Sequence, residues 1–291
     1  MQSAKYHLKE GVTIMLLRSL LFVPGNNEKL IAKAENLSAD IIIYDLEDAV
    51  SLEEKETARN LVKQALTNTS KSIFVRINAI GTDYFEEDVH AITQVKTSAL
   101  KGIVLPKSNR SADVETLEIL LHKLEAPQSI EIIPLLESAL GVHNAVEIGG
   151  TFERVQRLAF GSVDFALDIQ ATLTKEGTEL LYARSQIVMA SRVQNLQPPI
   201  DTVFIDFKDT DGLLSESQMV KNLGFGSKLA IHPEQIEIIN ETFSPSQEEI
   251  EEAKRIMEIV KNNGTAVFQL DGKMIDEPII KKAKRILNKL Q

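Results

Sequence analysis

Eight short apolar runs, each followed by a stretch of helical periodicity, constrain the fold of this 291-residue chain more than any other feature. The runs lie at residues 17–23, 40–46, 72–78, 102–107, 130–136, 157–161, 202–206 and 227–232. Helix-period stretches follow, for example, at residues 28–36, 53–66, 113–124 and 179–195. This alternation indicates βα units and a parallel sheet. Eight units close a barrel more naturally than they form an open doubly wound sheet, so the sequence predicts an α/β fold with a (β/α)8 barrel.

The pattern changes after the eighth unit, which divides the chain into three parts. Residues 17–243 hold the predicted catalytic barrel. Residues 1–16 precede the first apolar run, and we interpret them as a disordered leader. Residues 244–291 cannot join the barrel wall once eight strands are used. We therefore expect them to form a C-terminal extension that acts as a lid or contacts a neighbouring subunit.

The extension carries its own helix signals. Ser246 and Glu249 have the Ser-x-x-Glu spacing of a helix start, and Gly264 ends the same helical repeat. A short strand or hairpin comes next, and a last helix is expected to start at Pro278. The predicted extension is therefore mainly helical.

Composition narrows the class of function. A hydrophobic content of 43% supports a full-sized core. The net charge of −10 argues against sequence-independent binding to nucleic acid or to anionic membranes, because both need a basic surface. The absence of cysteine excludes disulfides, thiolate metal sites and a cysteine nucleophile. The apolar runs are too short to span a bilayer and no signal-peptide pattern occurs, so we expect a cytoplasmic enzyme that acts on small molecules.

The fifth and sixth apolar runs each end in a turn that carries a carboxylate. Glu137 follows the fifth run, in IEIIPLLES. Asp164 follows the sixth run, in AFGSVDFALD, 27 residues after Glu137. A parallel barrel builds its site at the C-terminal strand ends. Two carboxylates there can hold one hard cation and leave positions for water and substrate oxygens, which favours a Mg²⁺ enzyme acting on a keto acid. Alternatively, both acids only cap the helices that begin beside them. The residues alone leave both interpretations open.

Charged side chains also end the second, third and fourth runs. In IIIYDLEDAV, Asp45 and Glu47 point to one face and Asp48 to the other. Three crowded acids are costly unless a cation or its bound waters offset their repulsion. Arg76 follows the apolar run of SIFVRIN, where it could grip a carboxylate or a thioester oxygen. Lys107 closes the fourth run in the same way.

Two lysines follow the first run. Lys29 and Lys33 stand four residues apart and so share one face of the helix expected there. A helix N-terminus beside two ammonium groups can bind phosphate, although a solvated lysine face has the same pattern. The five histidines show no metal-ligand spacing such as HExxH. Only His232 lies at a strand end, and we interpret it as structural.

Taken in order, these segments resemble a known family. RSLLFVPGNNEKLIAKA, YDLEDAV, VRIN, LPK, PLLES, FGSVDFALD, GTELLYAR, IDTVFIDFKDTDGL, LGFGSKLAIHPEQI and GKMID are similar to the citrate lyase beta chain and its stand-alone relatives, including citramalyl-CoA lyase, in the HpcH/HpaI aldolase superfamily. The resemblance covers residues 17 to 291 and involves nearly every strand end. It implies a TIM barrel, a homotrimer or homohexamer, and Mg²⁺-dependent cleavage or formation of a carbon–carbon bond beside an acyl thioester.

The resemblance also implies roles for individual residues. Glu137 and Asp164 match the ligands of Mg²⁺, which Mn²⁺ could replace, and Glu137 also contacts substrate. Arg76 matches the substrate-binding arginine and is a catalytic candidate. Asp276 in GKMID matches the acid or base carried on the mobile tail. The remaining contacts to coenzyme A or an acyl-carrier thioester would come from Phe22, Lys29, Lys33, Ala230 and Ile231. The acids expected around this site are Asp45, Glu47 and Asp48.

The activity implied by the resemblance is cleavage of a 3-hydroxyacyl thioester of the citryl-, citramalyl- or malyl-CoA type. The products would be a keto acid such as oxaloacetate, pyruvate or glyoxylate and an acetyl thioester. The alternatives are the beta subunit of a citrate lyase complex, with alpha and acyl-carrier chains as partners, and a condensing enzyme like malate or citramalate synthase. The extended IDFKDTDGL and AIHPEQI segments favour the free-standing enzyme. A non-catalytic scaffold is disfavoured, because the acids, Arg76 and Asp276 are all present.

Overall fold

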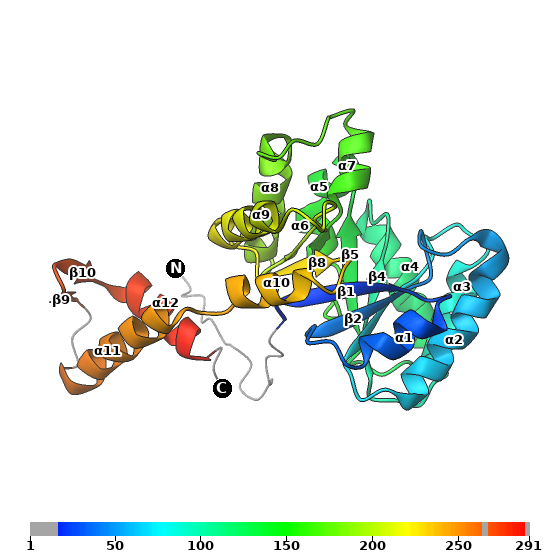
Figure 1. The fold of residues 1–291 in the computed structure, drawn as a ribbon, viewed down its shortest axis with the longest axis horizontal. Coiled ribbons are helices and arrows are strands. Elements are labelled where there is room, and N and C mark those ends of the chain that lie inside the picture. Colours follow the sequence, from blue (N-terminus) through cyan, green and yellow to red (C-terminus); the bar gives the residue numbers. More distant parts are fainter. Residues whose placement is uncertain (1–16, 264–266, 289–291) are drawn as a thin grey trace, which may run out of the picture. The chain divides into compact units, whose positions relative to one another are not determined.

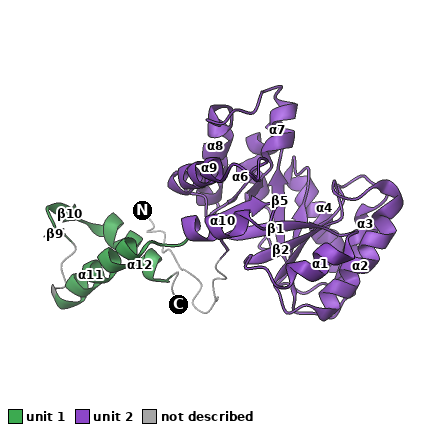
Figure 2. Cartoon of the chain, viewed as in Figure 1, with its two compact units in different colours: residues 1–16, 244–291 green, residues 17–243 purple. Residues whose placement is uncertain are grey.

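The computed structural model describes residues 17–263 and 267–288. These residues fall into two compact units, shown in different colours in Figure 2. One unit is Leu17–Phe243, and the other contains the described residues from Ser244 onward. The leader predicted for residues 1–16 lies outside the described residues. Within those residues, every helix is too short or too polar to cross a membrane.

The first unit is a closed barrel of eight parallel strands surrounded by helices (Figure 1). The strands are β1 (Ser19–Pro24), β2 (Ile41–Asp45), β3 (Ile73–Arg76), β4 (Leu100–Leu105), β5 (Glu131–Leu136), β6 (Ala159–Phe160), β7 (Ile200–Asp201) and β8 (Ser227–Ala230). Each strand pairs with the next in the chain, and β1 closes the circle by pairing with β8, with Leu20 beside Leu229. The prediction of a TIM barrel is confirmed.

Helices follow the strands along the chain. They are α1 (Glu28–Ala34), α2 (Lys55–Asn68), α3 (Phe85–Thr93), α4 (Ser111–Lys123), α5 (Ala139–His143), α6 (Ala145–Gly149), α7 (Ser162–Asp168), α8 (Leu181–Val193), α9 (Thr210–Leu223) and α10 (Gln235–Phe243), with 3-10 turns at Leu52–Glu54 and Thr178–Leu180. The helix α9 ends at Leu223, and the Gly224 that follows has a φ of 115°, a left-handed conformation that glycine adopts without steric cost.

Alternation along each strand builds two layers of core. On β2, Ile42 and Tyr44 pack in the main cluster with Val62 of α2, between sheet and helices. Ile41 and Ile43 are equally buried but point to the other face, which is the barrel interior. All five residues of β2 are buried, and a strand covered on both faces needs an unbroken apolar run such as Ile-Ile-Ile.

The prediction of a seventh strand at residues 202–206 is wrong. The strand is Ile200–Asp201, and Ile200 pairs with Ala159 of β6 and with Ser227 of β8. The next residue is held by its side chain instead, because the Thr202 hydroxyl accepts a hydrogen bond from the Ser162 backbone N–H at 2.9 Å. The apolar, β-branched run that follows favoured the wrong range. The other predicted ranges all overlap observed strands.

A buried ion network joins the last two strands to the helices outside them. Asp201 and Lys228 are fully buried, and the Lys228 ammonium lies 2.6 Å from Asp201 Oδ2. Arg184 of α8 adds a second contact to Asp201 at 2.9 Å, and Glu216 of α9 contacts Lys228 at 2.6 Å. Burial acts to raise the pKa of Asp201, but the two cations outweigh it and the pKa is lowered. Asp201 is therefore favoured in its ionised form although it is buried.

The second unit is a helical hairpin with a small two-stranded sheet. It contains α11 (Gln247–Asn263), β9 (Phe268–Leu270), β10 (Lys273–Ile275) and α12 (Glu277–Asn288). The predicted capping box is confirmed, since the Ser246 N–H donates to Glu249 at 2.9 Å and the Glu249 N–H donates to Ser246 Oγ at 3.2 Å. Gly264 lies outside the described residues. The unit has its own apolar cluster, formed by Ala253, Ile256, Ile275, Ile280 and Ala283.

Candidate active site

Five charged positions meet at the C-terminal end of the barrel. Asp45 ends β2 and Arg76 ends β3. Glu137 follows β5 directly, and Asp164 lies in the first turn of α7, just after β6. Lys107 follows β4. Because all eight strands are parallel, these strand ends share one mouth of the barrel, where sites of this fold are built.

Arg76 is held by the carboxylate of Asp45 in bidentate fashion. Its Nε donates to Asp45 Oδ1 at 2.8 Å and its Nη2 donates to Oδ2 at 2.6 Å. The same carboxylate accepts the backbone N–H groups of Glu47 at 2.9 Å and Ala49 at 3.2 Å. Asp45 therefore fixes both the guanidinium and the loop that follows β2.

The other side of Arg76 faces two further acids and an aromatic ring. Nη1 lies 3.1 Å from Glu47 and 3.2 Å from Asp48. The guanidinium carbon lies 4.8 Å from the centre of the Phe22 ring, a cation–π contact. Burial acts to lower the pKa of Arg76, but the bonds to Asp45 and the charges of all three acids raise it. The repulsion expected among the acids is thus offset by a cation of the chain itself.

Lys107 links this cluster to Glu137. Its ammonium lies 2.6 Å from Glu47 Oε1, and its backbone N–H donates to Glu137 Oε1 at 2.6 Å. Lys107 adopts a φ of 52°, a left-handed conformation that is uncommon for a residue with a side chain. This turn lets one residue bind two acids from different strands.

Glu137 is buried with one carboxylate oxygen against Gly161. A Cβ added to Gly161 would lie 2.9 Å from Glu137 Oε2 and 2.8 Å from its Cβ, so only glycine fits there. Burial, followed by the charge of Glu47, raises the pKa of Glu137 to about 8, with a further contribution from Asp164. The Lys107 N–H opposes this shift. A carboxylate so costly to ionise is one that a bound cation would stabilise.

The donor set around Glu137 fits Mg²⁺. Mg²⁺ binds through one or two carboxylates and keeps several waters, and it prefers oxygen ligands. Glu137 and the exposed Asp164 supply two such carboxylates from neighbouring strand ends. Across residues 17–263 and 267–288 no three acids or histidines gather as a metal-binding group, so a cation here would depend on this pair and on substrate oxygens.

Helix capping does not account for Glu137. The N-cap of α5 is Ser138, whose hydroxyl accepts the Gly141 N–H at 3.0 Å. The N-cap of α7 is Gly161, and Asp164 lies inside the first turn. Glu137 accepts the N–H of Lys107 instead, in a different βα unit. The capping interpretation is therefore wrong for Glu137.

The residues expected to contact a thioester come from the first and last units of the barrel. Lys29 and Lys33 are exposed on α1. Ala230 is buried at the end of β8, and Ile231 after it is 41% exposed. The sequence did not identify Gln235, whose Oε1 accepts the N–H of Ile231 at 2.9 Å and fixes this turn. The sequence signal for this contact was the position of Gln235, a polar residue four residues after Ile231 and at the start of α10.

His232 has a structural role in the same turn, as interpreted from the sequence. Its ring stacks on Phe207 with 4.4 Å between the ring centres. Its Nδ1 accepts the backbone N–H of Glu234 at 3.3 Å. The stack joins the loop after β7 to the turn after β8.

Asp276 belongs to the second compact unit. It is half-buried between β10 and α12, and its Oδ1 accepts the Ile279 N–H at 3.4 Å. Its backbone carbonyl accepts the Ile280 N–H at 3.0 Å. Asp276 is therefore positioned at the start of α12, after a hairpin whose turn uses the left-handed residues Asp271 and Gly272.

Two family models match this chain, and known proteins resemble it over most of its length. The family model for HpcH/HpaI aldolase/citrate lyase matches residues 18–233, and that for the C-C bond lyase of the TIM-barrel fold matches residues 179–291. Citrate lyase subunit beta of Leuconostoc mesenteroides subsp. cremoris is 36% identical over 283 residues, which cover 94% of this chain and 92% of that protein. Human mitochondrial citramalyl-CoA lyase is 34% identical over 291 residues, covering 92% of this chain and 83% of that protein.

A solved structure shows the same fold with ligands bound. It is the protein CitE from Mycobacterium tuberculosis in complex with magnesium, acetoacetate and coenzyme A. Its TM-score is 0.78 at 28% identity, over 94% of this chain and 98% of that one.

Proposed function

This chain belongs to the HpcH/HpaI aldolase/citrate lyase family, and on that premise we propose that it is a Mg²⁺-dependent carbon–carbon lyase. Its substrate is a 3-hydroxyacyl thioester of the citramalyl-, malyl- or citryl-CoA type. The products are a keto acid, such as pyruvate, glyoxylate or oxaloacetate, and acetyl-CoA. The observation that carries the proposal is the chain of contacts at one mouth of the barrel: Glu47 binds both Arg76 and the Lys107 ammonium, and the Lys107 backbone N–H binds Glu137.

Each of these residues has a separate role in a retro-Claisen cleavage. Bound Mg²⁺, held by Glu137 and Asp164, would act as a Lewis acid that favours loss of the proton from the substrate hydroxyl. The hydroxyl proton passes to solvent. The bond between the hydroxyl-bearing carbon and the thioester α-carbon breaks, so that the hydroxyl carbon becomes a ketone and the electron pair of that bond leaves with the thioester enolate. Arg76 stabilises the developing charge on the enolate oxygen. Asp276 donates the proton that converts the enolate into the acetyl thioester.

The assay that tests this function uses the purified chain with citramalyl-CoA, malyl-CoA and citryl-CoA in turn. We expect keto acid and acetyl-CoA in equal amounts, and complete loss of turnover when EDTA removes the metal. Keto acid is measured by coupling to lactate or malate dehydrogenase. No cleavage of any of the three substrates, with or without Mg²⁺, contradicts the proposal.

A second candidate is the beta subunit of a citrate lyase complex, because a protein of that name is among the relatives. In that case cleavage requires citryl-acyl-carrier protein and the alpha and acyl-carrier chains. Turnover of citryl-acyl-carrier protein together with no turnover of free CoA thioesters selects this alternative. For the free-standing enzyme we propose a homo-oligomer of the cytoplasm. The net charge of −10 argues against sequence-independent binding to nucleic acid.

We expect Lys29 and Lys33 to bind the phosphates of coenzyme A. Both are exposed on α1, directly after the strand that carries Phe22. Replacing both by methionine should weaken thioester binding at least about tenfold at low salt, because one charged contact contributes ~1.5 kcal/mol. Binding of the free keto acid should not change. Isothermal titration calorimetry at several salt concentrations measures both affinities.

The matched control changes Lys96 and Lys123 to methionine. Both are exposed, and they lie before β4 and at the end of α4, away from the strand C-termini. The control removes the same charge from the protein. If both double variants bind thioester equally well, Lys29 and Lys33 form only a solvated face.

A further inference from the structure

A buried lysine contacts the loop that follows β2, which we call the acid loop because Asp45, Glu47 and Asp48 lie at its start. Lys55 is the first residue of α2 and is 5% exposed. Its ammonium donates to the backbone carbonyls of Leu46 and Glu47, both at 2.7 Å. A buried ammonium is tolerated only where hydrogen bonds satisfy it. Lys55 therefore holds two consecutive carbonyls of the loop that carries Asp45, Glu47 and Asp48.

A second group of buried polar residues fixes the same loop from the side of β3. Asn78 Nδ2 donates to the Leu46 carbonyl at 2.9 Å and to Asp88 Oδ2 at 2.6 Å. Asp88 also accepts the Asn78 N–H at 2.9 Å and Arg59 Nε at 3.0 Å. The Leu46 N–H in turn donates to the Arg76 carbonyl at 2.9 Å. The loop after β2 is thus bonded to the strand that carries Arg76.

The charge of Lys55 complements the acids above it. Burial lowers the pKa of Lys55, whereas the charges of Asp45, Asp88, Glu47 and Asp48 act to raise it. Three of these acids, Asp45, Glu47 and Asp48, also pair with Arg76, and Glu47 pairs with Lys107 as well. Lys55 thus binds the backbone carbonyls of the acid loop, whereas Arg76 and Lys107 bind its carboxylate side chains.

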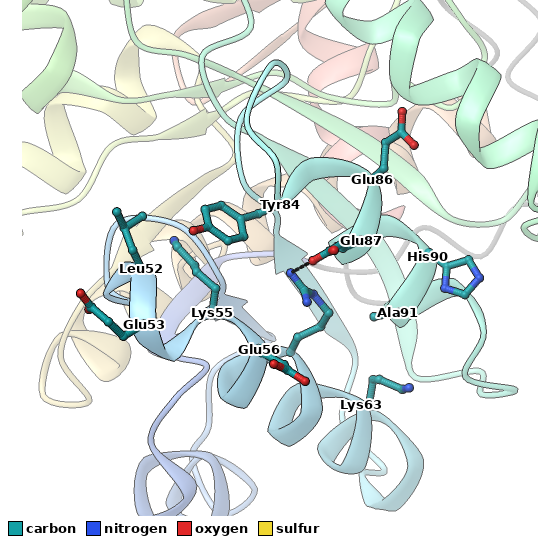
Figure 3. A pocket seen from close by; sticks show the side chains of 11 residues that line it. Leu52, Glu53, Lys55, Glu56, Lys63, Tyr84, Glu86, Glu87, His90 and Ala91 are labelled. Atoms are coloured by element: carbon teal, nitrogen blue, oxygen red, sulfur yellow. Dashed lines mark ion pairs between the residues drawn. The ribbon is translucent and has the colours of Figure 1, made fainter.

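Figure 3 shows Lys55 at the edge of a groove between α2 and α3. The groove has a volume of about 770 Å³ and also contains Lys63 of the same helix. The Lys55 side chain points toward Tyr84, and its ammonium lies 5.8 Å from the centre of that ring.

We propose that Lys55 is a positioning residue of the active site: its bonds to the Leu46 and Glu47 carbonyls set the loop so that Asp45 grips Arg76 and Glu47 reaches Lys107. The catalytic part of this inference rests on the proposed lyase function. Each carbonyl keeps one other donor without Lys55, since Asn78 binds Leu46 and the Val50 N–H binds Glu47 at 3.1 Å. Loss of the ammonium should therefore leave the barrel folded and relax the loop.

The test compares Lys55→Met with the control Lys63→Met, which removes the same charge from the same helix and the same groove. We expect Lys55→Met to lower kcat by roughly 100-fold with a smaller change in KM, because a shift of about 1 Å in a catalytic group has an effect of this size. Lys63→Met should stay within about twofold of the unchanged protein. Lys55→Arg, which keeps donors for the carbonyls, should recover part of kcat.

Hydrogen–deuterium exchange gives a readout that does not depend on turnover. The N–H groups of Glu47 and Ala49 are protected by Asp45. We expect faster exchange at residues 45–50 in Lys55→Met and unchanged exchange in Lys63→Met. If Lys55→Met does not fold, Lys55→Gln, which keeps one amide donor, takes its place in both measurements.

The outcomes separate this inference from the proposed function. Faster exchange together with lower kcat supports the positioning role. Unchanged exchange overturns it, and so does faster exchange with kcat equal to that of Lys63→Met. If the unchanged protein cleaves no thioester, the proposed function fails, and the exchange result alone then supports or overturns the role of Lys55 in the loop.

Discussion

Replacing Glu137 by glutamine is expected to lower kcat for thioester cleavage by at least about 10³-fold. A catalytic metal supplies several kcal/mol of stabilisation in the transition state, and about 4 kcal/mol corresponds to this factor. Glu137 accepts a bond from the Lys107 N–H, and the glutamine oxygen can keep that bond, so the fold should remain intact. Adding Asp164→Asn should remove any remaining dependence on Mg²⁺.

The measurement is steady-state kinetics across a Mg²⁺ titration, with circular dichroism to confirm folding. Glu153→Gln is the matched control, because Glu153 is exposed and precedes β6, at the opposite end of the strand from the site. Full activity of the Glu137→Gln, Asp164→Asn double variant, with no effect of EDTA, would show that these carboxylates hold no metal.

The raised pKa of Glu137 makes the same site sensitive to pH. In the folded protein, the Glu137 carboxyl has a pKa of about 8 and keeps its proton up to that pH. In the unfolded chain its pKa is about 4.3, so the proton is already lost between these two pH values. The metal-free protein should therefore lose stability as pH rises through this window. Mg²⁺ must displace the proton, so its affinity should fall about tenfold per pH unit below 8. Calorimetry from pH 6 to 9 tests this, and a flat profile contradicts it.

Replacing Asp276 by asparagine is expected to lower kcat by roughly 10²–10⁴-fold and to change thioester binding little. That range is typical for one group that transfers a proton in the transition state. Asparagine keeps an oxygen that can accept the Ile279 N–H at the start of α12, so the helix should be preserved. Asp271→Asn is the matched control, because it makes the same change in the hairpin turn, where Asp271 pairs with Arg255 on the surface.

The mixing experiment asks whether Asp276 serves its own subunit or a neighbour. Asp276 lies in the compact unit that follows the eight complete βα units, which suits a residue shared across a subunit boundary. We expect oligomers mixed from Asp276→Asn and Arg76→Ala subunits, each inactive alone, to regain part of the activity. No recovery after demonstrated subunit exchange places Asp276 in its own chain's site. Full activity of Asp276→Asn alone removes it from the mechanism.

Much of the fold follows from local patterns in the sequence. Apolar runs such as Ile-Ile-Ile on β2 fix strands that are buried on both faces, and their number fixes a closed barrel. The capping box at Ser246 and Glu249 is also a local signal, and it is confirmed. The seventh strand was misplaced because the Thr202 hydroxyl bonds to Ser162, 40 residues away, and a local pattern carries no sign of such a bond.

The sequence by itself determined that charged residues would follow the strands and that parallel strands would bring them to one mouth of the barrel. Only the tertiary structure decided which charges bind each other. Arg76 and Asp45 are 31 residues apart and Lys107 and Glu47 are 60 apart, so barrel register brings each pair together. The same holds for Lys55. The sequence shows only a lysine near the start of a helix, whereas packing of α2 against the loop after β2 brings its ammonium to the carbonyls of Leu46 and Glu47. The sequence specifies the chemistry of each side chain, whereas the burial of a side chain and its pairing with another depend on contacts between distant segments.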